Sequence, residues 1–72
     1  RGLGDVYKRQ RRTLAAWFRH NVQPLATSKA LFIHRNTLEY RLNRISELTG
    51  LDLGNFDDRL LLYVALQLDE ER

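Results

Sequence analysis

The sequence contains no cysteine and a single proline, and none of its apolar runs approaches the roughly 20 residues that span a membrane. The absence of cysteine excludes disulfides and thiolate metal sites, and it fits a reducing cytoplasm. The N-terminus also lacks the apolar segment of a secretory signal peptide. We therefore expect a cytoplasmic protein without a membrane segment.

The chain is short and holds few residues that a metal or a catalytic reaction could use. Its 72 residues allow one domain, with no room for an enzyme cleft between lobes. The two histidines, His20 and His34, have no cysteine or nearby pair of carboxylates to complete a metal site. Ser28 and Ser46 have no positioned base. We predict that the chain is not an enzyme and has no catalytic residues, metal or cofactor.

Residues 24–49 are predicted to form two short helices joined by a tight apolar turn. Pro24 suits a first helical turn, where its missing N–H has no partner to lose. A small residue is followed by apolar residues three, five and ten positions later, which is the spacing of helix-turn-helix packing. These residues are Ser28, Leu31, Ile33 and Leu38. Phe32 stands where glycine is often found, so we expect it to have a negative φ or to bear a modest left-handed cost.

The second helix of this unit is predicted over residues 36–49. Asn36 is a good N-cap, and Glu39 three residues later makes a variant of the capping box. One stripe repeats at i, i+4, i+7 and i+11 and is expected to face the core. It consists of Leu38, Leu42, Ile45 and Thr49. At 100° steps, an adjacent face carries Thr37, Tyr40, Arg41 and Arg44.

The first helix is predicted over residues 13–21, with Thr13 as its N-cap. Its buried stripe consists of Leu14, Trp17 and Phe18. Residues 1–10 contain two glycines and no helical stripe, and they resemble a translated sequencing-adapter remnant. We therefore interpret residues 1–10 as a non-native or disordered scar and place the domain in residues 11–72.

The last helix is predicted to follow a loop that begins at Gly50, a natural left-handed C-cap. Asp57 is expected to cap this helix, and Phe56 to pack against Leu61 as a hydrophobic staple. The loop's apolar side chains should close the bottom of the core; they are Leu51, Leu53 and Phe56. Together these patterns predict an all-α fold, a small three- to four-helix bundle containing a helix-turn-helix.

The last helix is apolar on two faces, of which a domain this small can bury only one well. The face expected to be buried comprises Leu60, Leu61, Val64, Ala65 and Leu68. The other comprises Leu62, Tyr63 and Leu66. We expect this second face to be a partly exposed interaction surface that docks on another domain or on a second copy. The alternative is that the first helix wraps far enough around to cover it.

The run ALFIHRNTLEYRLNRISELTGLDL, with NFDDRLLLYVALQL after it, resembles the C-terminal helix-turn-helix domain of the PucR-type bacterial regulators. Within that family it most resembles the carbohydrate diacid regulators, which activate sugar-diacid uptake and catabolism. The resemblance covers about residues 11–72, and I-H-R-N-T-L-x-Y-R-L is its most specific motif. It implies sequence-specific DNA binding by a module at the end of a longer chain, with the sensor domain for small organic acids missing here.

The net charge of +3 is unevenly distributed along the sequence. Residues 1–22 carry six cationic side chains and one acidic one, and residues 23–50 carry four and two. The last 22 residues carry two cationic side chains and six acidic ones. A phosphate backbone would attract the first 50 residues and repel the tail. Ordinary solvated charges explain the same distribution equally well.

The start of helix 36–49 is expected to enter the major groove, because direct readout needs donors and acceptors on a helix start. Arg35 and Arg41 are the predicted base readers, since a bidentate arginine on guanine is the commonest specific contact. Thr37 and Tyr40 are expected to contact phosphate or a thymine methyl group. The predicted phosphate contacts are Lys29, Arg44 and Arg12.

Two residues near this helix start have a structural alternative to DNA binding. Asn36 cannot read a base if its side chain is consumed by capping its own helix. His34 is expected either to contact DNA or to stabilise the turn through a hydrogen bond.

Three functions remain compatible with the sequence. The first is sequence-specific binding of double-stranded DNA by a transcription activator, acting as a dimer on two half-sites about one helical turn apart. The second is a helical protein-interaction or dimerisation module without specific DNA readout, which the excess apolar surface of the last helix favours. The third is binding of structured RNA, which is disfavoured because the sequence shows no sheet with stacked aromatics.

Overall fold

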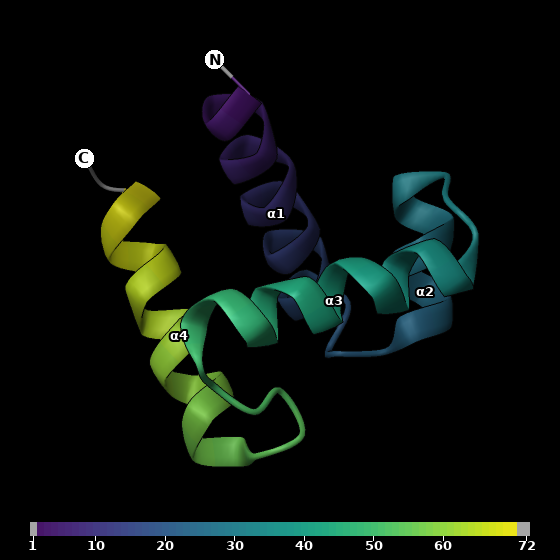
Figure 1. The fold of residues 1–72 in the computed structure, drawn as a ribbon. Coiled ribbons are helices and arrows are strands. Elements are labelled where there is room, and N and C mark those ends of the chain that lie inside the picture. Colours follow the sequence, from purple (N-terminus) through teal and green to yellow (C-terminus); the bar gives the residue numbers. More distant parts are fainter. Residues whose placement is uncertain (1, 71–72) are drawn as a thin grey trace.

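The structure, a computed structural model, describes the backbone of residues 2–70 and the side chains of residues 7–69. Four helices make up the described part: α1 (Gly2–Arg19), α2 (Pro24–Leu31), α3 (Arg35–Thr49) and α4 (Phe56–Glu70). α1 lies between α2 and α4, and α3 crosses it (Figure 1). The predicted all-α helix-turn-helix fold is confirmed. Residues 1, 71 and 72, which the predicted segments 1–10 and 11–72 include, lie outside the described residues.

α1 begins far earlier than the sequence pattern indicated. The predicted start at Thr13 is wrong, because Thr13 lies inside α1 with 1% of its surface exposed, and its Oγ1 donates a hydrogen bond to the Arg9 carbonyl at 2.9 Å. A threonine inside a helix satisfies its hydroxyl in this way. Tyr7 lies two turns before Leu14 and continues its stripe. The interpretation of residues 1–10 as a non-native scar stays a prediction, although residues 2–10 are helical.

α1 also ends earlier than predicted, at Arg19. Asn21 and Val22, one inside the predicted helix and one after it, have positive φ angles of 58° and 54°. A positive φ is strained for a β-branched residue such as Val22. Two interactions hold Val22 there: its backbone N–H donates to the Trp17 carbonyl at 2.8 Å, and its side chain packs against the core.

The core forms where α1 meets α3 and α4. Its buried cluster consists of Leu14, Trp17, Ile45 and Leu62, with Phe18, Val22, Leu42, Leu51 and Leu53 packed around it. The predicted burial of Leu14 and Trp17 is confirmed, with 7% and 6% of their surfaces exposed. Burial of an aromatic side chain such as Trp17 contributes about 2–3 kcal/mol.

The helix-turn-helix itself has its own tightly packed contact. Leu38 has no exposed surface, and Ser28, the predicted small residue of the unit, is 3% exposed. α2 and α3 therefore approach closely, as a small side chain at the crossing allows. Leu25, which lies on α2 away from this contact, is 56% exposed.

The two faces of α4 are the reverse of the prediction. Leu62 and Leu66, expected to be partly exposed, are 8% and 7% exposed because they face α1. Tyr63 is 44% exposed and places its ring edge-on against Phe18, with 5.3 Å between the centroids. The exposed apolar face instead comprises Leu60, Leu61, Val64 and Leu68. The long α1 determines this outcome, since it covers the face of α4 that a shorter first helix would have left open.

The ends of α3 and α4 are fixed by caps, of which one was predicted correctly. Gly50 has a φ of 74° and its N–H donates to the Ser46 carbonyl at 2.8 Å, which confirms it as a left-handed C-cap. α4, however, is capped by Asn55, whose Oδ1 accepts a hydrogen bond from the Asp58 N–H at 3.0 Å. The prediction of Asp57 as the cap is wrong. Phe56 is 66% exposed, so it neither staples the helix nor closes the core.

The turn between α2 and α3 is strained at Phe32. This residue has φ 58° and ψ 41°, so the left-handed alternative of the prediction holds, and its side chain is 94% exposed. A left-handed conformation costs a residue with a Cβ about 1–2 kcal/mol. The ring offsets little of this cost, because it is almost wholly in solvent.

Phe32→Gly is expected to raise the free energy of unfolding by about 1 kcal/mol, because glycine adopts the left-handed conformation without a Cβ clash. Urea denaturation followed by helical circular dichroism measures the change. Phe32→Ala is the matched control, since it removes the exposed ring but keeps the Cβ. An equal gain from alanine would show that the ring, and not the backbone, is the source of the effect.

Candidate nucleic-acid interface

His34, and not Asn36, caps the start of α3. The backbone of His34 is extended, and its Nδ1 accepts a hydrogen bond from the Asn36 N–H at 3.0 Å. The predicted cap at Asn36 is therefore wrong by two residues, and helix α3 begins at Arg35. The predicted capping box is also absent, because Glu39 pairs with Arg35. The turn-stabilising alternative for His34 is confirmed, and the exposed Asn36 side chain is not consumed by capping.

The outward face of α3 lies opposite its buried stripe. Leu38 and Ile45 point into the protein, with 0% and 4% of their surfaces exposed. At 100° per residue, the opposite side of the helix carries side chains four, three and four residues apart. These are Asn36, Tyr40, Asn43 and Glu47, and all four are exposed. Thr37 lies beside them and is also exposed.

Asn43 was not among the predicted site residues. It is separated by one turn from Tyr40 and by two turns from Asn36, so a helical projection of the sequence contains this signal. Asn43 carries no charge, and the cationic side chains of α3, which point most directly to DNA, lie toward the edges of the outward face.

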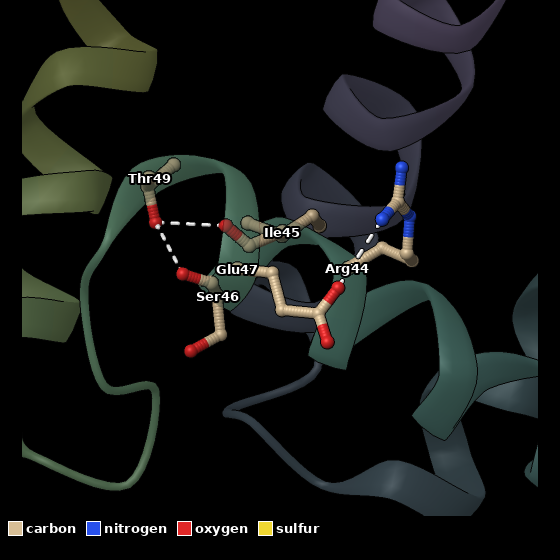
Figure 2. Close-up of polar contacts among 5 residues, drawn as sticks. All are labelled: Arg44, Ile45, Ser46, Glu47 and Thr49. Atoms are coloured by element: carbon tan, nitrogen blue, oxygen red, sulfur yellow. Dashed lines mark hydrogen bonds and ion pairs between the residues drawn. The ribbon is translucent and has the colours of Figure 1, made fainter.

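Two of the predicted DNA-contacting arginines form ion pairs along α3. Arg35 Nε lies 3.3 Å from Glu39 Oε2, and Arg44 Nη1 donates to Glu47 Oε1 at 3.2 Å. Figure 2 shows the Arg44–Glu47 pair spanning one turn of the helix. Exposed pairs at this spacing contribute only about 0.3–0.5 kcal/mol. These weak ion pairs would cost little to break if either arginine contacted DNA.

The C-terminal end of α3 is occupied by internal hydrogen bonds. Thr49 Oγ1 donates to the Ile45 carbonyl at 2.8 Å, as Figure 2 shows, and accepts from the Leu51 N–H at 3.2 Å. The predicted place of Thr49 in the buried stripe is wrong, because the residue is exposed. Its hydroxyl shields main-chain groups of the helix end. The hydroxyl of Thr49 is therefore satisfied within the protein, whereas the exposed polar side chains of the outward face extend from Asn36 to Glu47.

Arg41 does not lie on the outward face. It is partly buried on the flank of α3 toward α1, where it lines a hollow with Arg12 and two further cations of α1. Lys29, another predicted contact, is exposed in the last turn of α2. Of the predicted contacts on α3, Asn36 and Tyr40 therefore lie on the outward face and Thr37 lies beside it. Arg35 and Arg41 lie on opposite flanks of the helix, and Lys29 lies on α2.

Asp52, in the loop after α3, and Asp58, in the first turn of α4, are engaged in local hydrogen bonds. Asp52 Oδ1 accepts from the Gly54 N–H at 2.8 Å, and Asp58 Oδ2 accepts from the Asp52 N–H at 2.8 Å. The loop folds back along α3, so that Asp52 lines a hollow with Glu39 and Asn43 of that helix. Within the described residues, no group of three or more metal-ligating side chains comes together, and no helix is long and apolar enough to cross a membrane.

Comparison with known proteins gives a family and several relatives. The profile of the PucR C-terminal helix-turn-helix domain matches residues 10–68. The proline-responsive transcriptional activator PutR of Bacillus subtilis is 38% identical over 61 residues, which cover 85% of this chain. The transcriptional activator PmfR of Paenarthrobacter nicotinovorans is 42% identical over 57 residues, which cover 79% of this chain.

A third relative, the DNA-binding transcriptional activator AdeR of Bacillus subtilis, is 46% identical over 41 residues, which cover 57% of this chain. The chain matches only 15%, 12% and 10% of the lengths of PutR, PmfR and AdeR. No solved structure matches it.

The matched residues 10–68 include the whole of α2, α3 and the turn between them, together with the outward face described above. The four helices, with α2 and α3 joined by a short turn, fit a helix-turn-helix domain. The chain therefore belongs to the family of PucR C-terminal helix-turn-helix domains, the DNA-binding domains of a group of transcriptional regulators.

Proposed function

We propose that this chain binds double-stranded DNA sequence-specifically, with the first half of α3 in the major groove, as the DNA-binding module of a bacterial transcriptional activator in the cytoplasm. The observation that carries the proposal is the outward face at the start of α3. There, exposed polar side chains project from the second helix of a helix-turn-helix whose opposite side is locked in the core. A helix in this position presents its first residues to base edges.

The residues at the start of α3, on the outward face and beside it, differ in the contacts for which they are suited. Asn36 has a free amide that can pair with adenine N6 and N7, and Arg35 has a guanidinium that can pair with guanine O6 and N7. Tyr40 is 66% exposed and offers its ring to a thymine methyl group or its hydroxyl to a phosphate. Thr37 offers a methyl group and a hydroxyl to the same partners. Arg44 and Lys29, at the sides, are placed as phosphate contacts.

The genes controlled are proposed to be those of sugar-diacid utilisation, on the strength of the resemblance to the carbohydrate diacid regulators. The relatives named above are activators, and most of their length lies outside the region that matches this chain. A sensor domain in that remaining length would supply the effector response. Two copies bound to half-sites one helical turn apart would supply the specificity that one small helix lacks.

A randomised duplex pool tests this function directly. The chain should enrich one sequence motif, and its affinity for that motif should fall steeply between low and moderate salt, because bound phosphates release counterions. Selection at two salt concentrations, followed by sequencing, measures both effects. Binding without an enriched motif would contradict specific readout, and absence of binding would favour the second function below.

Asn36→Ala should relax the preference at one base position of that motif, at a cost of about 1–3 kcal/mol, because one bidentate contact is lost. The fold should be unaffected, since His34 caps the helix. Gln67→Ala is the matched control, because it removes an exposed amide from α4. If both variants gave the wild-type motif, Asn36 would not read a base.

The second function is protein interaction or dimerisation through α4, and a specific observation favours it. Four apolar side chains on one face of α4 are 46–61% exposed: Leu60, Leu61, Val64 and Leu68. Adjacent apolar side chains left in water on a small domain commonly mark a contact surface. This face replaces the predicted surface of Leu62, Tyr63 and Leu66, two of which are buried. It is compatible with DNA binding, because it lies on a different helix from the outward face.

Leu61→Glu combined with Leu68→Glu should weaken self-association at least tenfold if this face joins two copies, because two charges would be placed in an apolar contact. Sedimentation equilibrium of the chain measures the association. Leu25→Glu is the control, since it charges an equally exposed leucine on α2. The idea would be rejected if the double variant associated as strongly as the control.

A further inference from the structure

A hollow between α1 and α3 collects cationic side chains from both helices. Its volume is about 520 Å³, and its lining residues are Lys8, Arg9, Arg12, Leu31, Ile33 and Arg41. The three α1 cations share one side of the helix. Positions 8 and 9 are adjacent, and position 12 lies about one turn after both of them. Arg41 reaches the hollow from α3, and the two apolar residues come from the end of α2 and the following turn.

The charges of this hollow are not neutralised within the described residues. No carboxylate lines it, and the ion pairs of the described chain employ Arg11, Arg35 and Arg44 instead. Arg11 is the informative comparison, because it is adjacent to Arg12 in the sequence. Its Nε lies 3.0 Å from Asp69 Oδ2, on the side of α1 that faces α4. Among the described side chains, Arg11 is thus paired on the side of α1 that faces α4, and Arg12 lines the hollow without an ion pair.

Four like charges around one hollow repel one another, and an anion placed among them would relieve that repulsion. Arginine suits this task, since its planar fork binds two oxygens of a phosphate at once. Leu31 and Ile33 contribute apolar lining beside these cations, and less polar surroundings strengthen the attraction between opposite charges. The hollow therefore has the chemistry of a phosphate site.

We infer that this hollow binds a backbone phosphate of DNA, with Arg12 and Arg41 as its two arms. The inference rests on the proposed DNA-binding function and changes the role predicted for Arg41, which contacts a phosphate and does not read a base. Arg41 lies on the flank of α3 and not on its outward face, so it is directed at the strand bordering the groove. Lys8 and Arg9 extend the attraction along that strand.

The two arms do not depend on the N-terminal segment that was interpreted as a scar. Both Arg12 and Arg41 lie within residues 10–68, which match the family profile. Lys8 and Arg9 precede that match. The site would therefore be retained, with less long-range attraction, in a chain that began at residue 10.

The test compares the salt dependence of DNA binding for the 72-residue chain and its variants, on the duplex motif enriched from the random pool. Arg12→Gln combined with Arg41→Gln should lower affinity roughly tenfold at low salt and reduce the slope of log affinity against log salt by about one, since one phosphate contact is lost. The enriched motif should stay the same. Arg11→Gln, which removes a neighbouring charge from the other side of α1, should leave the slope within experimental error.

The single substitution Arg41→Lys keeps the positive charge but removes the planar guanidinium. It should retain the slope of log affinity against log salt while weakening DNA binding a few fold. This variant also decides the matter if Arg41→Gln does not fold, which thermal unfolding would reveal. A change of preferred base in an Arg41 variant, with the slope unchanged, would overturn the phosphate site. The phosphate site would also be overturned if the double variant Arg12→Gln, Arg41→Gln had the same affinity and the same salt dependence as Arg11→Gln. If the wild-type chain bound no duplex at all, the proposed function itself would fail.

Discussion

The packing of Ile45 against Leu14 and Trp17 fixes the rotation of α3 about its own axis. Because side chains follow one another at 100° around a helix, burial of one stripe determines the direction of all the others. It places Asn36 and Tyr40 on the outward side. A DNA-binding helix needs this constraint, because a small rotation would exchange polar donors for apolar side chains at the groove. The aromatic and aliphatic contacts of α1 thus determine which residues a ligand meets.

The same packing divides the charges of the molecule between two sides of α1. Arg11 is paired with Asp69 of α4, whereas Arg12 faces the hollow beside α3. Arg12, which forms no ion pair with a described residue, lies on the side next to the helix-turn-helix, and Asp52 and Asp58 hold the loop beyond α3. A duplex approaching α3 therefore meets positive charge at its edge. Asp52 and Asp58 are engaged in hydrogen bonds of the loop, and the two glutamates of α3, Glu39 and Glu47, are each paired with an arginine of the same helix.

Local patterns predicted the helix-turn-helix well but the ends and faces of other helices poorly. Pro24, the buried Leu38 and the left-handed cap at Gly50 act through nearest neighbours or through helical periodicity, so the sequence displays them directly. The cap of α3 was placed two residues late, because histidine is a rarer cap than asparagine. The faces of α4 were exchanged because two apolar faces compete for one core, and only the length of α1 decides between them.

The sequence by itself determined the fold class, the family and the set of polar residues at the start of α3, because periodicity, capping and motif spacing are properties of neighbouring residues. Helical periodicity also indicated which of those residues point outward, but the tertiary structure alone decided which residues of other helices lie beside them. Arg41 and Arg12 line the same hollow because α1 packs against α3. No local rule contains that result, because residues 12 and 41 are brought together by a core formed elsewhere in the chain.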